Sequence, residues 1–216
     1  MSKFNAKTIR RTLIAAILGS ASSAANAAEN SQAQQTEKAE ASAKLELKEG
    51  FNISVQSNEI DDVFEGSGLG MSYQADFGNL LKEQEKSLNL YGRMHYQINR
   101  SDEDAQLAQT DITLGLNFAH SDKLHVYLES AILQQEVSGQ PTSFTRSYDV
   151  TRLGARYNFK KNFVLNGAVI HRNGKENELG YRIALESTKT DAYSMGIGFS
   201  SVGDNDSMFI SIVSKF

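Results

Sequence analysis

Apolar and polar side chains alternate in two-residue steps along most of the chain after residue 50. In 87–99, for example, Leu88 and Leu90 fall on one face, whereas Arg93 and His95 fall on the other. Successive side chains of a β-strand point to opposite faces, so this period predicts strands with one apolar and one polar face. The same rhythm recurs at 51–57, 67–77, 110–119, 123–133, 148–159, 162–172, 178–187, 191–200 and 208–216. We therefore predict an all-β chain of ten strands, or of eight if 51–57 does not pair.

The connectors between these stretches favour an up-and-down antiparallel β-barrel. The links at 120–123, 160–161 and 188–190 are tight, although 78–86 is not, whereas the intervening links are mostly longer and polar. The longer set comprises 58–66, 100–109, 134–147, 173–177 and 201–206. Short turns on one rim and longer loops on the other are typical of barrels that span an outer membrane. The link lengths therefore predict a transmembrane barrel whose longer loops face the cell exterior.

Alternation alone does not say which face of the barrel points outward, and a water-soluble barrel would have the same period. Two features favour an apolar exterior. Aromatic residues gather at the strand ends of one rim, as an interfacial girdle requires: Phe77, Phe118, Phe159, Phe163 and Tyr193, with Phe51 and Phe216 at the chain ends. The polar faces mix glycines with long charged side chains, which suits a crowded interior. Both features indicate a lipid-facing exterior.

The first fifty residues predict export. Lys3, Lys7, Arg10 and Arg11 precede a short apolar stretch, and a small-residue cleavage site ends at Ala27, as in a signal peptide. We predict a signal peptide at 1–27, a polar periplasmic arm at 28–50 and the barrel at 51–216. The chain contains no cysteine, and a closed barrel needs no disulfides. A formal net charge of −4 argues against nucleic acid as a partner.

The leader, the alternating strands and the terminal aromatic strand together resemble the small outer-membrane β-barrels of Gram-negative bacteria, the opacity-protein and OmpX-like group. The resemblance covers 51–216 and implies a cell outer-membrane location in contact with lipid and lipopolysaccharide. It also implies assembly by the barrel-assembly machinery and periplasmic chaperones. The last strand, with Ile210, Ile212 and Phe216, is then expected to act as the assembly signal.

Charged residues on the polar faces are the first candidates for function. The alternation of side chains along each strand assigns eight of these residues to the lumen: Arg93, His95, Asp111, Glu129, Arg152, Arg156, Arg182 and Glu186. Unpaired charges inside a narrow barrel are unfavourable, so one interpretation is a salt-bridge network that fills the lumen. Because four arginines face three carboxylates, the other interpretation is a narrow pathway that prefers small anions.

Catalytic groups are not evident in the sequence. None of His95, His125 and His171 stands in the His-x-Ser pattern of lipid A deacylases, and His120 lies in a predicted turn. An omptin-type protease site built on Asp61, Asp62 and His171 would need strands that extend far beyond the membrane. We predict a non-enzymatic protein without cofactor or metal, with a structural, envelope-stability or surface-interaction role. The alternatives are a narrow anion-preferring porin and, third, an outer-membrane hydrolase.

Overall fold

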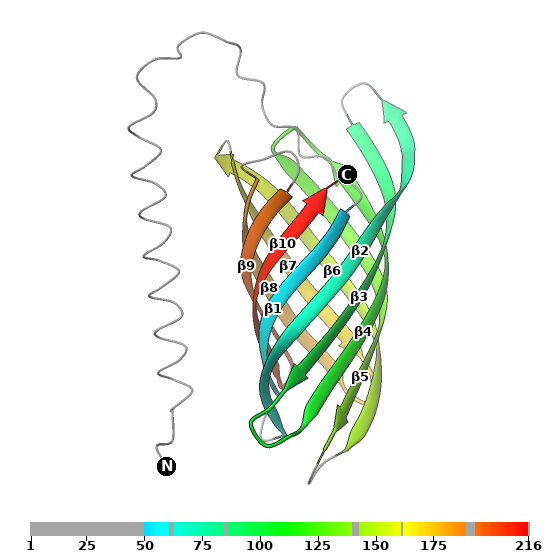
Figure 1. The fold of residues 1–216 in the computed structure, drawn as a ribbon. Coiled ribbons are helices and arrows are strands. Elements are labelled where there is room, and N and C mark those ends of the chain that lie inside the picture. The colour runs from blue at the N-terminus through cyan, green and yellow to red at the C-terminus, as the bar shows by residue number, and fades with distance from the viewer. Residues whose placement is uncertain are drawn as a thin grey trace, which may run out of the picture. The chain divides into compact units, whose positions relative to one another are not determined.

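The computed structural model describes residues 50–60, 63–83, 86–139, 143–160, 162–188 and 193–215, which form ten strands (Figure 1). The strands are β1 (Gly50–Ile60), β2 (Phe64–Glu83), β3 (Lys86–Arg100), β4 (Gln106–Ala119), β5 (Leu124–Ser138), β6 (Phe144–Lys160), β7 (Phe163–Asn173), β8 (Asn177–Ser187), β9 (Tyr193–Val202) and β10 (Asn205–Lys215). In this described part of the chain, no helix has the length and apolarity needed to cross a membrane. The predicted signal peptide, the predicted arm up to residue 49 and Phe216 lie outside the described residues. Gly50, predicted as the end of the arm, is the first residue of β1.

Each strand pairs antiparallel with its neighbours in sequence, and β1 pairs with β10 to close the barrel. The closing pair is continuous from Gly50 opposite Lys215 to Ile60 opposite Asn205. On its other side β1 pairs with β2 over the same length. Closure gives every strand a neighbour on both sides, although Ala75–Glu83 of β2 extends beyond the end of β1. The fold is therefore the ten-stranded form of the predicted barrel, not the eight-stranded alternative.

The chain enters and leaves the barrel at the same end, which we call the terminal rim (Figure 1). The links after β2, β4, β6 and β8 lie at this rim, and the links after the odd-numbered strands lie at the opposite end, the distal rim. The prediction of longer distal loops was wrong. The strands continue into the predicted loops, so that Asn58 pairs with Gly66 and Glu136 with Thr145. Cross-strand pairing satisfies backbone groups even where the side chains are polar, and β2 reaches 20 residues and β6 reaches 17.

The surface of the barrel is apolar and its interior contains many polar groups. Large apolar side chains such as Ile53 and Leu153 are more than half exposed on the outside. Asn99, Asn117 and Glu129, by contrast, are buried inside, with exposed fractions of 0–3%. A water-soluble protein buries its apolar side chains and exposes its charges. The arrangement seen here is that of a transmembrane barrel with its apolar face toward lipid, and the soluble-barrel alternative does not fit.

Glycines on the inward faces allow aromatic rings to lie against the wall of the barrel. A Cβ atom at Gly115 would stand 2.3 Å from the Tyr91 ring, and one at Gly154 would stand 2.4 Å from the Tyr127 ring. Gly198 has the same relation to Phe209, at 2.3 Å. Aromatic rings packed over glycines of neighbouring strands are a known device for building curved sheets. The mixture of glycines with large residues noted in the sequence thus has a packing reason.

Candidate functional site: the lumen

The centre of the lumen contains one connected group of charged side chains from β3 to β6, which we call the central network. Glu129 on β5 is buried and accepts three hydrogen bonds. The Tyr91 hydroxyl donates at 2.7 Å, an Arg93 nitrogen donates at 2.9 Å and an Arg152 nitrogen donates at 3.3 Å. Glu129 and Arg152 face each other directly across the β5–β6 pair. A single carboxylate therefore holds two arginines and a tyrosine together.

Arg152 extends this network to a second carboxylate. Its other terminal nitrogen donates to Asp111 on β4, and the Thr113 hydroxyl donates to the same carboxylate group. Arg152 also lies 3.3 Å from the Thr113 hydroxyl oxygen. The central network thus pairs two arginines with two carboxylates. Charge-assisted hydrogen bonds of this kind hold side chains in fixed positions, so the network forms a rigid layer across part of the lumen.

A second group, the β5–β8 network, lies on the neighbouring strands. Arg156 on β6 forms an ion pair with Glu186 on β8 at 2.8 Å. Asn166 on β7 donates to the same glutamate at 3.5 Å and accepts from the Tyr127 hydroxyl at 2.8 Å. Tyr127 is the residue whose ring covers Gly154, so the packing of the wall and the polar network share one side chain.

Arg182 differs from the other arginines predicted for the lumen. No carboxylate among the described residues lies within ion-pairing distance of its guanidinium group. The guanidinium instead lies 4.3 Å from the centre of the Phe209 ring, a cation–π contact. His95, the remaining member of the predicted set, lies 3.2 Å through Nε2 from the Gln97 side-chain oxygen. The eight predicted lumen residues therefore fall into two networks and two separate positions.

An additional ion pair and several hydroxyl groups were missed from the sequence. Arg172 and Glu178 stand opposite each other in the β7–β8 pair, 3.6 Å apart. The sequence contained the information needed to predict this pair. The alternation assigns both residues to the inward face, and they lie on either side of the short link between β7 and β8. Tyr91, Thr113 and Tyr127 were missed for another reason. Their hydroxyl groups become network members only once the register of four strands is known.

The lumen also contains apolar side chains that the sequence analysis did not predict. One buried cluster comprises Ala131, Leu133, Tyr148, Val150, Ile170 and Val202 from β5, β6, β7 and β9. A second comprises Ile60, Phe64, Leu107 and Val137, with Val63, Ala105 and Phe144 packed against it. Ile60 and Phe64 flank the β1–β2 link, and Leu107 is the second residue of β4, so the second cluster lies at the distal rim. The distal half of the lumen thus combines apolar clusters with buried amide side chains such as Asn58, Asn99 and Gln135.

The other predicted residues lie on the exterior. Phe77, Phe159, Phe163 and Tyr193 are exposed on the outer face near the terminal rim, and Phe118 is half-buried there. The Phe159 and Phe163 ring centres lie 6.3 Å apart. On β10, Ile210 pairs with Val55 and Ile212 pairs with Ile53. The girdle and the assembly signal remain predictions.

No protein-family model matches this chain, and no curated protein matches it in sequence. Solved structures of outer-membrane proteins are similar to it in architecture. The KdgM porin in complex with disordered oligogalacturonate is 11% identical, with a TM-score of 0.45 over 76% of this chain and 99% of that chain. The NanC porin is 7% identical, with a TM-score of 0.46 over 76% of this chain and 100% of that chain. Ail, the attachment invasion locus protein of Yersinia pestis, is 12% identical, with a TM-score of 0.39 over 78% of this chain and 98% of that chain. Likenesses at this level concern the barrel architecture alone.

Proposed function

We propose that this chain is an outer-membrane barrel with a closed lumen, whose role is structural: it stabilises the envelope or presents a surface, without passing solutes. The observation that carries the proposal is the burial of inward-facing side chains along the lumen. Asn117 has an exposed fraction of 0%, Glu129 of 3% and Val150 of 1%. In a water-filled channel such side chains would be solvated. Their burial supports a lumen filled by neighbouring side chains, as in small barrels.

The two networks add an energetic reason for closure. A solute that passed through either network would have to displace Arg93 and Arg152 from Glu129, or Arg156 from Glu186. Removing one partner from a buried ion pair costs about 3–5 kcal/mol. Each solute that passed through a network would therefore have to separate at least one of these ion pairs.

A catalytic role has little support from the histidines. His125 lies 3.2 Å through Nδ1 from the Asn117 side-chain nitrogen, and His120 lies against Phe118. Among the hydrogen bonds of the described residues, none joins a histidine to a serine or threonine hydroxyl. A serine or threonine nucleophile activated by histidine requires such a pair, oriented by a third group.

Arg182 favours a second candidate function, a narrow pathway for small anions. Its guanidinium group contacts an aromatic ring and, among the described residues, no carboxylate. A cation on the lumen wall without a fixed counter-ion attracts anions and repels cations. For this candidate, the distal apolar clusters must move aside when an anion passes.

Ion conductance in a planar bilayer tests both candidates. The closed barrel predicts no current steps from protein shown by its circular dichroism to be folded. The anion pathway predicts discrete anion-selective steps that shrink in R182Q. The matched control is R146Q, because Arg146 lies over Phe144 at the same 4.3 Å but is exposed. Steps that remain unchanged in both variants would contradict both candidates.

A strain that lacks the chain tests the structural role. The proposal predicts increased sensitivity of that strain to detergents and to bulky antibiotics, with unchanged uptake of small anions. Expression of the intact chain should restore resistance. Loss of small-anion uptake with normal detergent resistance would contradict the structural role and support the pathway.

A further inference from the structure

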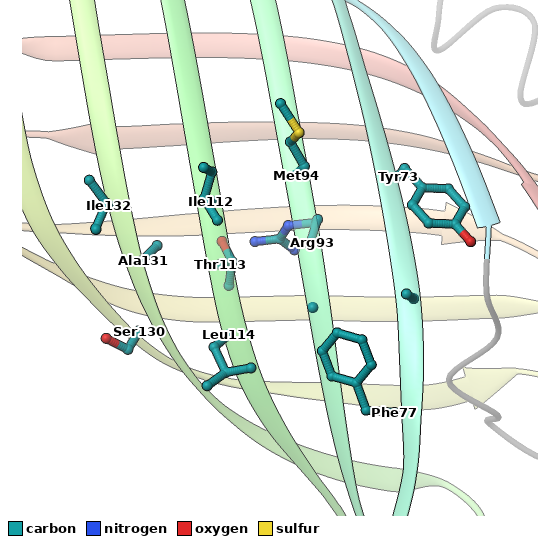
Figure 2. A pocket seen from close by; sticks show the side chains of 12 residues that line it. Tyr73, Phe77, Arg93, Met94, Ile112, Thr113, Leu114, Ser130, Ala131 and Ile132 are labelled. Atoms are coloured by element: carbon teal, nitrogen blue, oxygen red, sulfur yellow. The ribbon is translucent and has the colours of Figure 1, made fainter.

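A groove of about 520 Å³ runs across the outer face of β2 to β5 (Figure 2). Its floor includes the small residues Ala75, Gly92 and Ser130, and its walls include Phe77, Met94 and Ile132. The Phe77 ring lies against Gly92, where an added Cβ atom would stand 2.9 Å from the ring. The groove belongs to the apolar exterior of the barrel, so the molecules that reach it from outside are membrane lipids.

Three polar side chains continue the floor of this groove along the wall. Gly92, Leu114 and Ser130 are cross-strand partners, and the same row goes on to Thr151 on β6 and His171 on β7. Ser130, Thr151 and His171 are all exposed on the exterior. None of the three side chains makes a hydrogen bond or ion pair with another described residue. We call these three residues the polar row.

The polar row leads from the apolar surface toward its distal edge. Ser130 stands between two exposed apolar residues on its own face of β5, Leu128 and Ile132. Toward the distal rim, the next outward-facing residue after Thr151 on β6 is Asp149, and the next after His171 on β7 is Asn173. Ser130 is therefore at acyl-chain depth, whereas Thr151 and His171 lie at the border of the apolar surface.

Packing of the barrel does not explain the polar row. A polar side chain at acyl-chain depth on the lipid face, such as Ser130, has no water to solvate it, which makes it unfavourable there. Unpaired polar residues within a membrane are functional candidates by default. On β8 the row ends at Leu179, which is 70% exposed, so the wall is apolar again beyond His171.

We propose that the groove and the polar row form a binding site for one acylated membrane lipid of the leaflet next to the distal rim. An acyl chain lies along the groove, and the carbonyl groups that join it to the head group accept hydrogen bonds from Thr151 and His171. Ser130 lies between these two parts of the site. The site depends on the transmembrane barrel, but not on whether the lumen is closed.

Selectivity for a bound lipid arises from shape and hydrogen bonding. Lipid tails are as apolar as the groove, so burial of the chain alone does not favour the bound lipid over the surrounding lipid. The groove offers a contact surface for one acyl chain, and the polar row places hydroxyl and imidazole donors next to that surface. One neutral hydrogen bond corresponds to about a fivefold change in occupancy.

Native mass spectrometry of the intact barrel, extracted in mild detergent with a defined lipid, tests the site. Phosphatidylethanolamine and hexa-acylated lipid A are supplied in separate samples, so that the retained species identifies the lipid class. The wild-type chain is expected to retain one lipid. S130F, which fills the groove, should reduce retention about tenfold, and the T151V and H171L variants should each reduce it about fivefold. I183F is the matched control, because Ile183 is 53% exposed on β8, outside the groove and the row.

Circular dichroism and thermal unfolding establish that each variant is folded. No retained lipid in the wild type, or equal retention in S130F and I183F, would overturn the proposal. A dimer of the chain that S130F dissociates would also overturn it, because the groove would then be a contact between two copies. A lipid that I183F loses as readily as S130F would show nonspecific retention on the apolar exterior.

Discussion

Glu129 is the carboxylate on which the central network depends, and E129Q tests that dependence. The substitution keeps the size of the side chain and removes its charge. One oxygen remains to accept from Tyr91 or Arg93, but the ion pairs with Arg93 and Arg152 are lost. Arg152 keeps its pair with Asp111, whereas Arg93 has no second carboxylate partner among the described residues. The main cost is therefore an uncompensated charge at Arg93.

We expect E129Q to lower the free energy of unfolding by about 3–5 kcal/mol, the range for removal of one partner from a buried ion pair. Three separate hydrogen bonds to charged groups, at about 1.5–3 kcal/mol each, would give a larger upper limit. The remaining glutamine oxygen and the Asp111 pair keep the loss below that limit.

Reversible denaturant unfolding of the barrel in lipid vesicles measures this free energy. E136Q is the matched control, because Glu136 is on the same strand, is exposed and has no ion pair among the described residues. The control is expected to change stability by less than about 0.5 kcal/mol. If E129Q were as mild as E136Q, the central network would not contribute to stability. The argument that this network fixes the side chains that fill the lumen would then fail.

Two further predictions concern packing inside the barrel. G154A should destabilise the barrel by about 1–3 kcal/mol, because the new Cβ atom would stand 2.4 Å from the Tyr127 ring and 2.6 Å from the Gly167 backbone oxygen; G167A, with its nearest neighbour at 4.0 Å, should be nearly neutral in the same unfolding assay. L133A should cost about 2–5 kcal/mol by leaving a cavity in the buried cluster; I132A, on the lipid face, should cost far less, because lipid can fill the space. Equal losses within either pair would contradict the assigned packing.

Strand number and side-chain direction were predictable because alternation is a local property. Alternation alone assigned Ile183 and Arg182 to opposite faces, and the structure places Ile183 outside and Arg182 inside. The ends of the strands were not predictable in the same way. Residues such as Asn58 and Gly66 indicate a turn by composition, yet they continue the β1–β2 pairing.

Partners across the lumen required information that the sequence does not contain. Glu129 meets Arg93, two strands away, only after the register of β3, β4 and β5 is set. The apolar clusters near the distal rim were overlooked because the inward faces were expected to be polar throughout. Leu133 and Val150 share inward parity with charged residues on the same strands, and their apolar character was a usable signal.

Cysteine reactivity on β8 tests most directly that the barrel is apolar outside and closed inside, since the chain has no natural cysteine. Ile183 is 53% exposed and its neighbour Ala184 is 3% exposed. In folded protein in lipid vesicles, I183C is expected to react with a lipid-soluble maleimide and not with a charged one. A184C should react with neither until the barrel is unfolded. Rapid reaction of folded A184C with the charged reagent would show a water-filled lumen, and protection of I183C from the lipid-soluble reagent would contradict the outward apolar face.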